Sequence, residues 1–256
     1  MLIRVDGLDT FCQVDGRGAP VVLLHGWGVS GQSLEAVAVS LADGFRVLRL
    51  DLPGFGWSQA PPEAWGTAAY AAHVAATLDA LQIGRAAMVG HSFGGRIAIQ
   101  LAVTEPARAA RLILVASAGV RPRRGLRQRL RVGITKLLRG LAALPAIGGV
   151  IEPVRARWVE RVGSRDYRAA GRMRPTLVKV VNEDLTPVLP RVEAPTLILW
   201  GDRDQEVRRE AMDVMVSRIP GARFVVFAGA GHFPFQDAPM QFCRTLRGFL
   251  AEGERW

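Results

Sequence analysis

Cysteine is scarce in this sequence of 256 residues: Cys12 and Cys243 are its two thiols, and they lie far apart. Two distant cysteines argue against a disulfide framework and against a thiolate metal site, and they are typical of a reducing cytoplasm. No apolar stretch approaches the roughly 18 residues that cross a bilayer. The opening residues, MLIRVDGLDTF, lack the apolar core of an export signal. We therefore expect a cytoplasmic protein, and nothing in the sequence calls for a metal or an organic cofactor.

Positive charge is concentrated in one part of the chain. The formal net charge is +10, in a composition of 49% apolar and 22% charged residues that is ordinary for a globular protein. Residues 118–191 hold 15 Arg and 2 Lys against 5 acidic residues, so the whole positive excess lies in this segment. A chain of this length can fold as one α/β domain. The basic segment therefore needs its own explanation.

Short apolar runs alternate with longer helical patterns along most of the chain. The runs are apolar nearly throughout, as strands buried on both faces should be, and their alternation with helices predicts a mostly parallel sheet covered by helices. An opening pair, at 2–7 and 9–16, predicts an antiparallel hairpin at the sheet edge, for about eight strands in all. The expected buried strands are 21–26, 45–52, 86–92, 111–117, 196–202 and 223–229, and the expected helices are 33–42, 67–82, 94–104, 206–218 and 239–252.

One interval interrupts this alternation. Between Ser117 and Thr196 no convincing strand occurs, and prolines divide the interval into short helical pieces. Such a length is too great for an ordinary connection. We expect a core domain formed by residues 1–117 and 192–256, with an inserted, arginine-rich helical subdomain at 118–191.

The hexapeptide GHSFGG, residues 90–95, follows an expected strand and precedes an expected helix. This is the setting of a nucleophile elbow, in which a strained turn exposes a serine hydroxyl, here that of Ser92. Small neighbours such as Gly90, Gly94 and Gly95 tolerate the turn, and the helix N-terminus faces developing negative charge. A strand-to-helix turn with an unreactive serine is the alternative, so the partners of Ser92 decide.

A serine nucleophile needs a base within hydrogen-bond reach. Of the four histidines, His25 ends a strand, His73 lies in an alanine-rich helix, and His91 adjoins the serine with its side chain expected to point elsewhere. His232 stands in the loop GAGHFPF directly after the last expected strand. Open α/β sheets build their sites from loops at that edge, which makes His232 the predicted base.

The base in turn needs a carboxylate that orients the imidazole and stabilises its charged form. The segment LILWGDRDQEV offers two, Asp202 and Asp204, at the end of an expected strand. With either one, the order along the chain is serine, aspartate, histidine.

Five motifs in this order resemble the α/β hydrolase superfamily, in its group with a helical cap: HGWG, DLPGFGWS, GHSFGG, WGDRD and GAGHFPFQDAP. The resemblance implies that Asp204 is the acid, with Asp202 as fallback, although the proline usual after the acid is missing from DQEVRRE. It also implies an oxyanion hole formed by the backbone N–H groups of Trp27 and Phe93. A cap would cover the site and set substrate choice, with substrate contacts from Gly26, Leu137, Leu141, Trp158 and Phe233, although Leu137, Leu141 and Trp158 fit the core of the cap itself equally well.

The inserted segment has one amphipathic stretch whose role stays open. Its apolar residues have helical spacing beside a stripe of arginines, the former at Leu126, Leu130, Ile134, Leu137 and Leu141 and the latter at Arg123, Arg127 and Arg131. The arginines fit a solvated helix face, a cap that attracts an anionic substrate, or contact with an anionic membrane surface. No basic stripe is interleaved with aromatic residues, so nucleic-acid binding is not expected.

These features together predict a serine hydrolase that cleaves carboxylic esters with short or medium acyl groups, as a monomer or a homodimer. Serine at the elbow argues against dehalogenases and epoxide hydrolases, which carry aspartate there. The alternative is a carbon–carbon bond hydrolase of meta-cleavage products, but that group tends to carry asparagine and tryptophan where this chain has His91 and Phe233. Lactonase, thioesterase or perhydrolase activity with the same triad, or a receptor with low turnover, are further alternatives.

Overall fold

The structure is a computed structural model that describes residues 1–121, 126–144, 147–162 and 164–252, without the side chains of 126–132, 160 and 162. The chain forms two compact units. We call Met1–Arg121 with Pro175–Trp256 the core unit, and Pro122–Arg174 the helical unit. Each is described by itself.

The core unit contains one eight-stranded sheet in the order β1-β2-β4-β3-β5-β6-β7-β8. The first two strands form the predicted antiparallel hairpin, and β2 also pairs antiparallel with β4, whereas all later strands are parallel to one another. The predicted α/β hydrolase sheet is therefore confirmed. The strands are Leu2–Val5, Leu8–Asp15, Ala19–Leu24, Phe45–Leu50, Ala86–His91, Ala109–Val115, Thr196–Gly201 and Arg223–Phe227.

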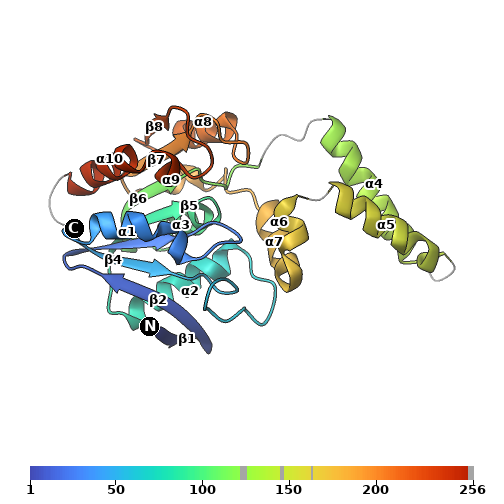
Figure 1. The fold of residues 1–256 in the computed structure, drawn as a ribbon, viewed down its shortest axis with the longest axis horizontal. Helices are drawn as coiled ribbons and strands as arrows, with labels where there is room; N and C mark the ends of the chain where they lie inside the picture. Colours follow the sequence, from blue (N-terminus) through green and yellow to red (C-terminus); the bar gives the residue numbers. More distant parts are fainter. Residues whose placement is uncertain (122–125, 145–146, 163, 253–256) are drawn as a thin grey trace. The chain divides into compact units, whose positions relative to one another are not determined.

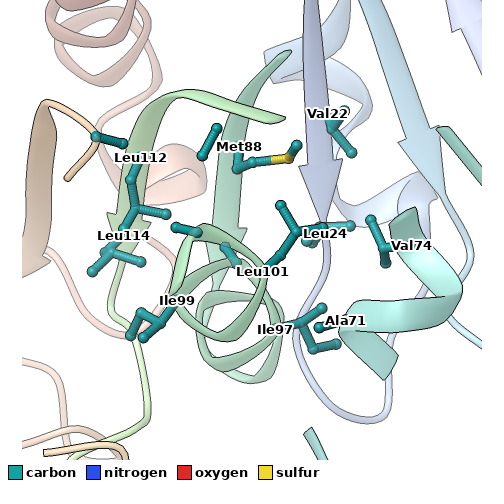
Figure 2. Close-up of a cluster of buried hydrophobic side chains, with 14 of the residues drawn as sticks. Val22, Leu24, Ala71, Val74, Met88, Ile97, Ile99, Leu101, Leu112 and Leu114 are labelled. Carbon is teal, nitrogen blue, oxygen red and sulfur yellow. The ribbon is translucent and has the colours of Figure 1, made fainter. Parts of the chain in front are cut away.

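Helices cover both faces of this sheet (Figure 1). Alternate residues of one strand point to opposite faces, so Val22 and Leu24 of β3 pack on one side and Val21 and Leu23 on the other. Figure 2 shows the first side, where Ile97 of α3 lies near Leu24. The first side is covered by α2 (Thr67–Ala80), α3 (Phe93–Thr104) and α8 (Arg209–Arg218), the second by α1 (Glu35–Leu41), α9 (Pro234–Asp237) and α10 (Pro239–Ala251).

The inner parallel strands form as they do because both faces are buried, whereas β8, which was also expected to be buried, lies at the sheet edge and buries only Phe227. Every residue of β5, β6 and β7 is buried, and burial of a single large aliphatic side chain stabilises the fold by about 1.5–3 kcal/mol. Three short 3-10 helices complete the core unit, at Gly31–Leu34, Pro106–Arg108 and Leu189–Arg191. In the described part of the chain, no helix has the length and apolar character needed to span a membrane.

The helical unit contains α4 (Leu126–Ala142), α5 (Gly148–Val162), α6 (Arg165–Ala169) and a 3-10 turn at Gly171–Met173. The indole Nε1 of Trp158 donates to Thr135 Oγ1 over 3.0 Å, which joins α5 to α4. Leu137 is exposed, whereas Leu141 and Trp158 are half-buried. The side chains of the predicted apolar residues Leu126 and Leu130, and of the arginine stripe at Arg123, Arg127 and Arg131, lie outside what the structure describes.

The end of the predicted insert belongs to the core unit. Residues 175–191 include most of α7 (Arg174–Asn182). Just after this helix, both carboxylate oxygens of Glu183 accept hydrogen bonds from Thr67 N at 3.1 Å, and the carboxylate also accepts one from the Thr67 hydroxyl. Thr67 is the first residue of α2, whose leading N–H groups have no acceptor within the helix. Glu183 thus caps α2 from a segment more than a hundred residues away.

We expect Glu183→Ala to lower the free energy of unfolding by about 1 kcal/mol, because an N-terminal amide and a hydroxyl lose their acceptor. Urea denaturation measures the change. Glu193→Ala removes an equal charge from an exposed position and serves as the control. Equal stability of the two variants would contradict a capping role.

Candidate active site

Ser92 has a backbone conformation that is rare outside glycine. It lies between β5, which ends at His91, and α3, which begins at Phe93, with φ of 49° and ψ of −107°. A side chain in this region of backbone space costs energy, and such strain is typical of functional sites. Three backbone hydrogen bonds hold the turn: Ser92 N donates to Val115 O at 2.9 Å, and Gly95 N and Ala118 N each donate to Ser92 O at 3.1 Å. The segment therefore has the sharp strand-to-helix geometry of an elbow.

The glycines of the elbow permit close approach of backbone to backbone. A Cβ on Gly94 would lie 2.2 Å from Leu24 O, and one on Gly90 would lie 2.4 Å from Gly94 O. Neither glycine has a positive φ, so space rather than backbone conformation excludes a larger residue at both positions.

The loop after β3 packs directly against the elbow. A Cβ on Gly26 would lie 2.8 Å from His91 Nδ1 and 3.5 Å from Ser92 Cβ. The ring centroids of Trp27 and Phe93 are 5.4 Å apart in an edge-on arrangement. Since Phe93 is the first residue of α3, its N–H has no acceptor within the helix. The two predicted oxyanion-hole residues therefore belong to segments in mutual contact.

His25 links this loop to the loop that follows β4. It is fully buried, Leu52 N donates to its Nε2 over 3.0 Å, and its Nδ1 lies 2.7 Å from Gly26 O. One nitrogen accepts and the other donates, so the ring is neutral. Burial lowers the pKa of His25 to about 4, which keeps it neutral at ordinary pH. The sequence pattern assigned no role to His25.

Asp51, at the end of β4, fixes two further loops. Its buried carboxylate accepts hydrogen bonds from Gly31 N at 2.7 Å and from Trp57 N at 2.9 Å. The motif DLPGFGWS contains this aspartate, but its spacing alone does not reveal the partner Gly31, which lies twenty residues earlier.

A buried carboxylate contacts the ring of His232. Asp204 Oδ2 lies 2.9 Å from His232 Nδ1, while its Oδ1 accepts from Glu206 N at 2.8 Å and Val207 N at 2.9 Å. The Asp204 side chain has no exposed surface. Asp202, the other carboxylate that the sequence offered, is exposed and accepts a hydrogen bond from Gly229 N at 2.7 Å. Of the two, Asp204 is the one that contacts the imidazole.

His91 supports the loop that carries His232. The His91 ring lies 4.8 Å from the His232 ring between centroids, and its Nε2 is 2.9 Å from the His232 carbonyl oxygen, so Nε2 carries the proton and donates it. Burial lowers the pKa of His91 to about 3. Phe233 and Phe235 enclose the same ring, with centroids 4.9 Å and 5.1 Å away. Sequence reasoning missed this contact.

The second imidazole nitrogen of His232 has a neighbour that sequence reasoning also missed. Glu206 Oε2 lies 3.3 Å from His232 Nε2, and the Glu206 side chain is 62% exposed. The ring of His232 therefore lies between two carboxylates, that of buried Asp204 and that of solvent-exposed Glu206. Within the described ranges of the chain, the hydroxyl of Ser92 makes no hydrogen bond with this ring.

The remaining predicted residues divide between the two units. Gly26 and the half-buried Phe233 belong to the core unit with Ser92 and His232, whereas Leu137, Leu141 and Trp158 belong to the helical unit.

Among the described residues, no three His, Cys, Asp or Glu side chains form a group that could hold a metal ion. The two carboxylates at His232 contact opposite ring nitrogens, which is unsuited to chelation of one ion.

The site residues follow the ends of parallel strands. Trp27 follows β3, Asp51 follows β4, Ser92 follows β5, Asp204 follows β7 and His232 follows β8. Carboxyl ends of parallel strands meet at one edge, where open α/β sheets bind ligands. A buried carboxylate, an imidazole and a strained serine at this edge are the components of nucleophilic catalysis.

Comparison with known proteins shows the family of the chain. A profile of the alpha/beta hydrolase family matches residues 21–245, and the chain belongs to that family. A pimeloyl-[acyl-carrier protein] methyl ester esterase of Aeromonas hydrophila is 30% identical over 249 residues, which cover 92% of this chain and 96% of the relative.

Two solved structures are similar over nearly the whole chain. An esterase from Exiguobacterium antarcticum is 26% identical, with a TM-score of 0.76 and coverage of 98% of both chains. A meta-cleavage product hydrolase from Pseudomonas fluorescens has a TM-score of 0.76 at 24% identity, with coverage of 99% of this chain and 98% of that one, and shows the fold alone. Family and esterase relatives together support hydrolase activity.

We expect acid to destabilise the folded protein from about pH 6.5 downward. His25 and His91 have pKa values of about 4 and about 3 in the folded chain against 6.5 for an exposed imidazole, so the unfolded chain binds more protons as pH falls. At pH 5 each histidine should lower the free energy of unfolding by roughly 2 kcal/mol.

Urea denaturation of the native protein and of His91→Asn at pH 7 and pH 5 measures this effect. The asparagine amide can still donate a hydrogen bond but does not titrate, so the variant should lose less stability between the two pH values. An equal loss in both proteins would show that His91 does not contribute.

Proposed function

We propose that this protein is a serine hydrolase that cleaves carboxylic esters with short or medium acyl groups through Ser92, His232 and Asp204. The observation that carries the proposal is the strained conformation of Ser92 at the end of β5, beside the loop in which His232 contacts buried Asp204. The ester-cleaving relatives named above support the same reaction class.

The proposed first half of the reaction acylates Ser92. His232 Nε2 removes the hydroxyl proton as Oγ attacks the ester carbonyl carbon, and the carbonyl oxygen becomes an oxyanion. Collapse of this intermediate breaks the bond to the alcohol, which leaves with the proton from His232. The product is an acyl ester on Ser92. Asp204 keeps the Nδ1 proton in place and stabilises the imidazolium.

The second half returns the free enzyme. His232 deprotonates a water molecule that attacks the acyl carbon, and the released Ser92 oxygen recovers a proton from the imidazolium. We propose that the main-chain N–H groups of Trp27 and Phe93 donate to the oxyanion in both halves. One such donor is typically worth about 10²–10³-fold in turnover. Because they act through the main chain, replacing either side chain tests packing rather than this interaction.

Substrate choice is proposed to depend on Gly26 and Phe233 beside the triad and on the helical unit as a cap, through Leu137, Leu141 and Trp158. The methyl ester of an acyl-carrier-bound acid, named for the Aeromonas relative, fits the same class of carbonyl substrate.

Three hypotheses remain for the role of the arginine-rich stretch: a solvated helix face, attraction of an anionic substrate, or contact with an anionic membrane. Co-sedimentation with anionic liposomes at low and high salt separates the last from the others.

The alternative is carbon–carbon hydrolysis of meta-cleavage products, because a hydrolase of that kind has a similar fold. His91 and Phe233 stand where that group tends to carry asparagine and tryptophan, which favours ester hydrolysis here. Lactones and thioesters would pass through the same acyl intermediate. A receptor with low turnover would react covalently with an organophosphate without cleaving substrates.

Ser92→Ala should lower hydrolysis of p-nitrophenyl acetate and butyrate to background, because no other hydroxyl occupies the elbow. Purified protein is assayed with an ester, a lactone and a ring-fission product, and an organophosphate labels the native chain in parallel. Near-normal turnover in Ser92→Ala would contradict the proposal, and turnover of the ring-fission product alone would favour the alternative.

Asp204→Asn should lower kcat by about 10³–10⁴-fold with little change in KM, because the uncharged amide cannot stabilise an imidazolium. Asp202→Asn, which alters the neighbouring exposed carboxylate, is the matched control and should retain most activity. A loss that is larger in Asp202→Asn would assign the acid to Asp202 instead.

A further inference from the structure

Glu206 belongs to the same turn as the buried acid but reaches the opposite nitrogen of the imidazole. Its backbone N–H donates to Asp204 Oδ1 over 2.8 Å, and its carboxylate Oε2 lies 3.3 Å from His232 Nε2. The backbone bond fixes where the residue stands, whereas the 62% exposed side chain can leave the ring for solvent. One loop thus presents two carboxylates to one histidine.

Contact with Glu206 is favourable only in one protonation state of His232. A neutral imidazole that donates from Nδ1 to Asp204 has a lone pair at Nε2, and a carboxylate facing that lone pair is repelled. A proton on Nε2 converts the repulsion into a charge-assisted hydrogen bond. The 3.3 Å separation is short enough for an ion pair once Nε2 carries a proton.

In the proposed reaction, Ser92 also needs His232 Nε2. This nitrogen must be free to accept the proton of Ser92, and the ring makes no hydrogen bond with that hydroxyl in the described part of the chain. We propose that Glu206 binds the imidazolium form of His232 at Nε2, competes there with Ser92, and so sets the pH below which the enzyme stops working. This inference rests on the function proposed above.

Other charged groups near the ring do not take this position. From the β7–α8 loop, Asp204 is bonded at Nδ1, and Asp202 and Arg203 are exposed. From α9, the Asp237 carboxylate accepts from Gly231 N at 2.7 Å. From β5, His91 stays uncharged at working pH because burial lowers its pKa to about 3. Phe233 and Phe235 carry no charge.

The effect of removing Glu206 has a definite sign. Its negative charge favours the protonated ring, so Glu206→Gln lets His232 lose its proton at a lower pH. An exposed ion pair is worth up to about 1 kcal/mol, and one pH unit corresponds to about 1.4 kcal/mol. The acid limb of the kcat/KM profile should therefore move down by about half a pH unit, and activity below that limb should rise about threefold.

The experiment measures kcat/KM for p-nitrophenyl acetate from pH 4.5 to 8.5 in the native protein, Glu206→Gln and Glu210→Gln. Glu210 is exposed in the first turn of α8 and loses the same charge, so its profile should coincide with that of the native protein. An unmoved acid limb in Glu206→Gln, or an equal movement in both variants, would overturn the proposal.

A second measurement does not depend on turnover. The ring proton resonance of His232 is titrated by NMR in Ser92→Ala, with and without Glu206→Gln, and its midpoint should fall by the same half unit. Coincident titrations would overturn the contact. If the native protein lacks Ser92-dependent ester cleavage, the proposed function fails, and a moved midpoint would then support the Glu206 contact while removing its link to catalysis.

Discussion

The backbone of Ser92 is the constraint around which the site is built. A residue with a side chain adopts a positive φ only where its surroundings impose it, at a cost of about 1–3 kcal/mol. Here the surroundings are close-packed main chain: a Cβ on Gly90 would clash with Gly94 O of α3, and a Cβ on Gly94 would clash with Leu24 O of β3. The conformational free energy that this turn costs is offset by burial of the side chains of the sheet to which it is attached.

Buried polar groups then fix the loops around the turn. Neutral His25 holds the loop of Trp27, Asp51 holds the loops after β3 and β4, and Asp204 holds the turn before α8. Buried acceptors without partners would cost more than their hydrogen bonds gain, so each of these side chains specifies one position for its loop. Catalytic groups on loops can be accurately placed only when the loops are held in this way.

Much of the fold followed from pattern alone. The doubly buried strands and the opening hairpin were predicted close to their observed bounds, because a period of two and a continuous apolar run reflect burial directly. The expected helix at 206–218 begins instead at Arg209, since the amides of Glu206 and Val207 bond to Asp204 rather than to a helix. Side-chain hydrogen bonds of this kind leave no periodic signal.

The contacts of the site were only partly predictable. Motif order indicated Ser92, Asp204 and His232, because each motif retains its place after a strand. The contacts of His91 with the His232 carbonyl, and of Glu206 with His232 Nε2, each join two segments that are separated in the sequence. Such partners depend on how loops meet in space, which spacing along the chain does not encode.

The convergence of Ser92, His232 and the two backbone donors on one carbonyl is tested most directly by a crystal structure of the protein after reaction with a phosphonate ester. We predict a phosphorus–oxygen bond to Ser92 Oγ, a phosphoryl oxygen within hydrogen-bond distance of the N–H groups of Trp27 and Phe93, and His232 Nε2 within reach of Oγ. Phosphonate on another residue, or a phosphoryl oxygen turned away from both amides, would contradict this arrangement.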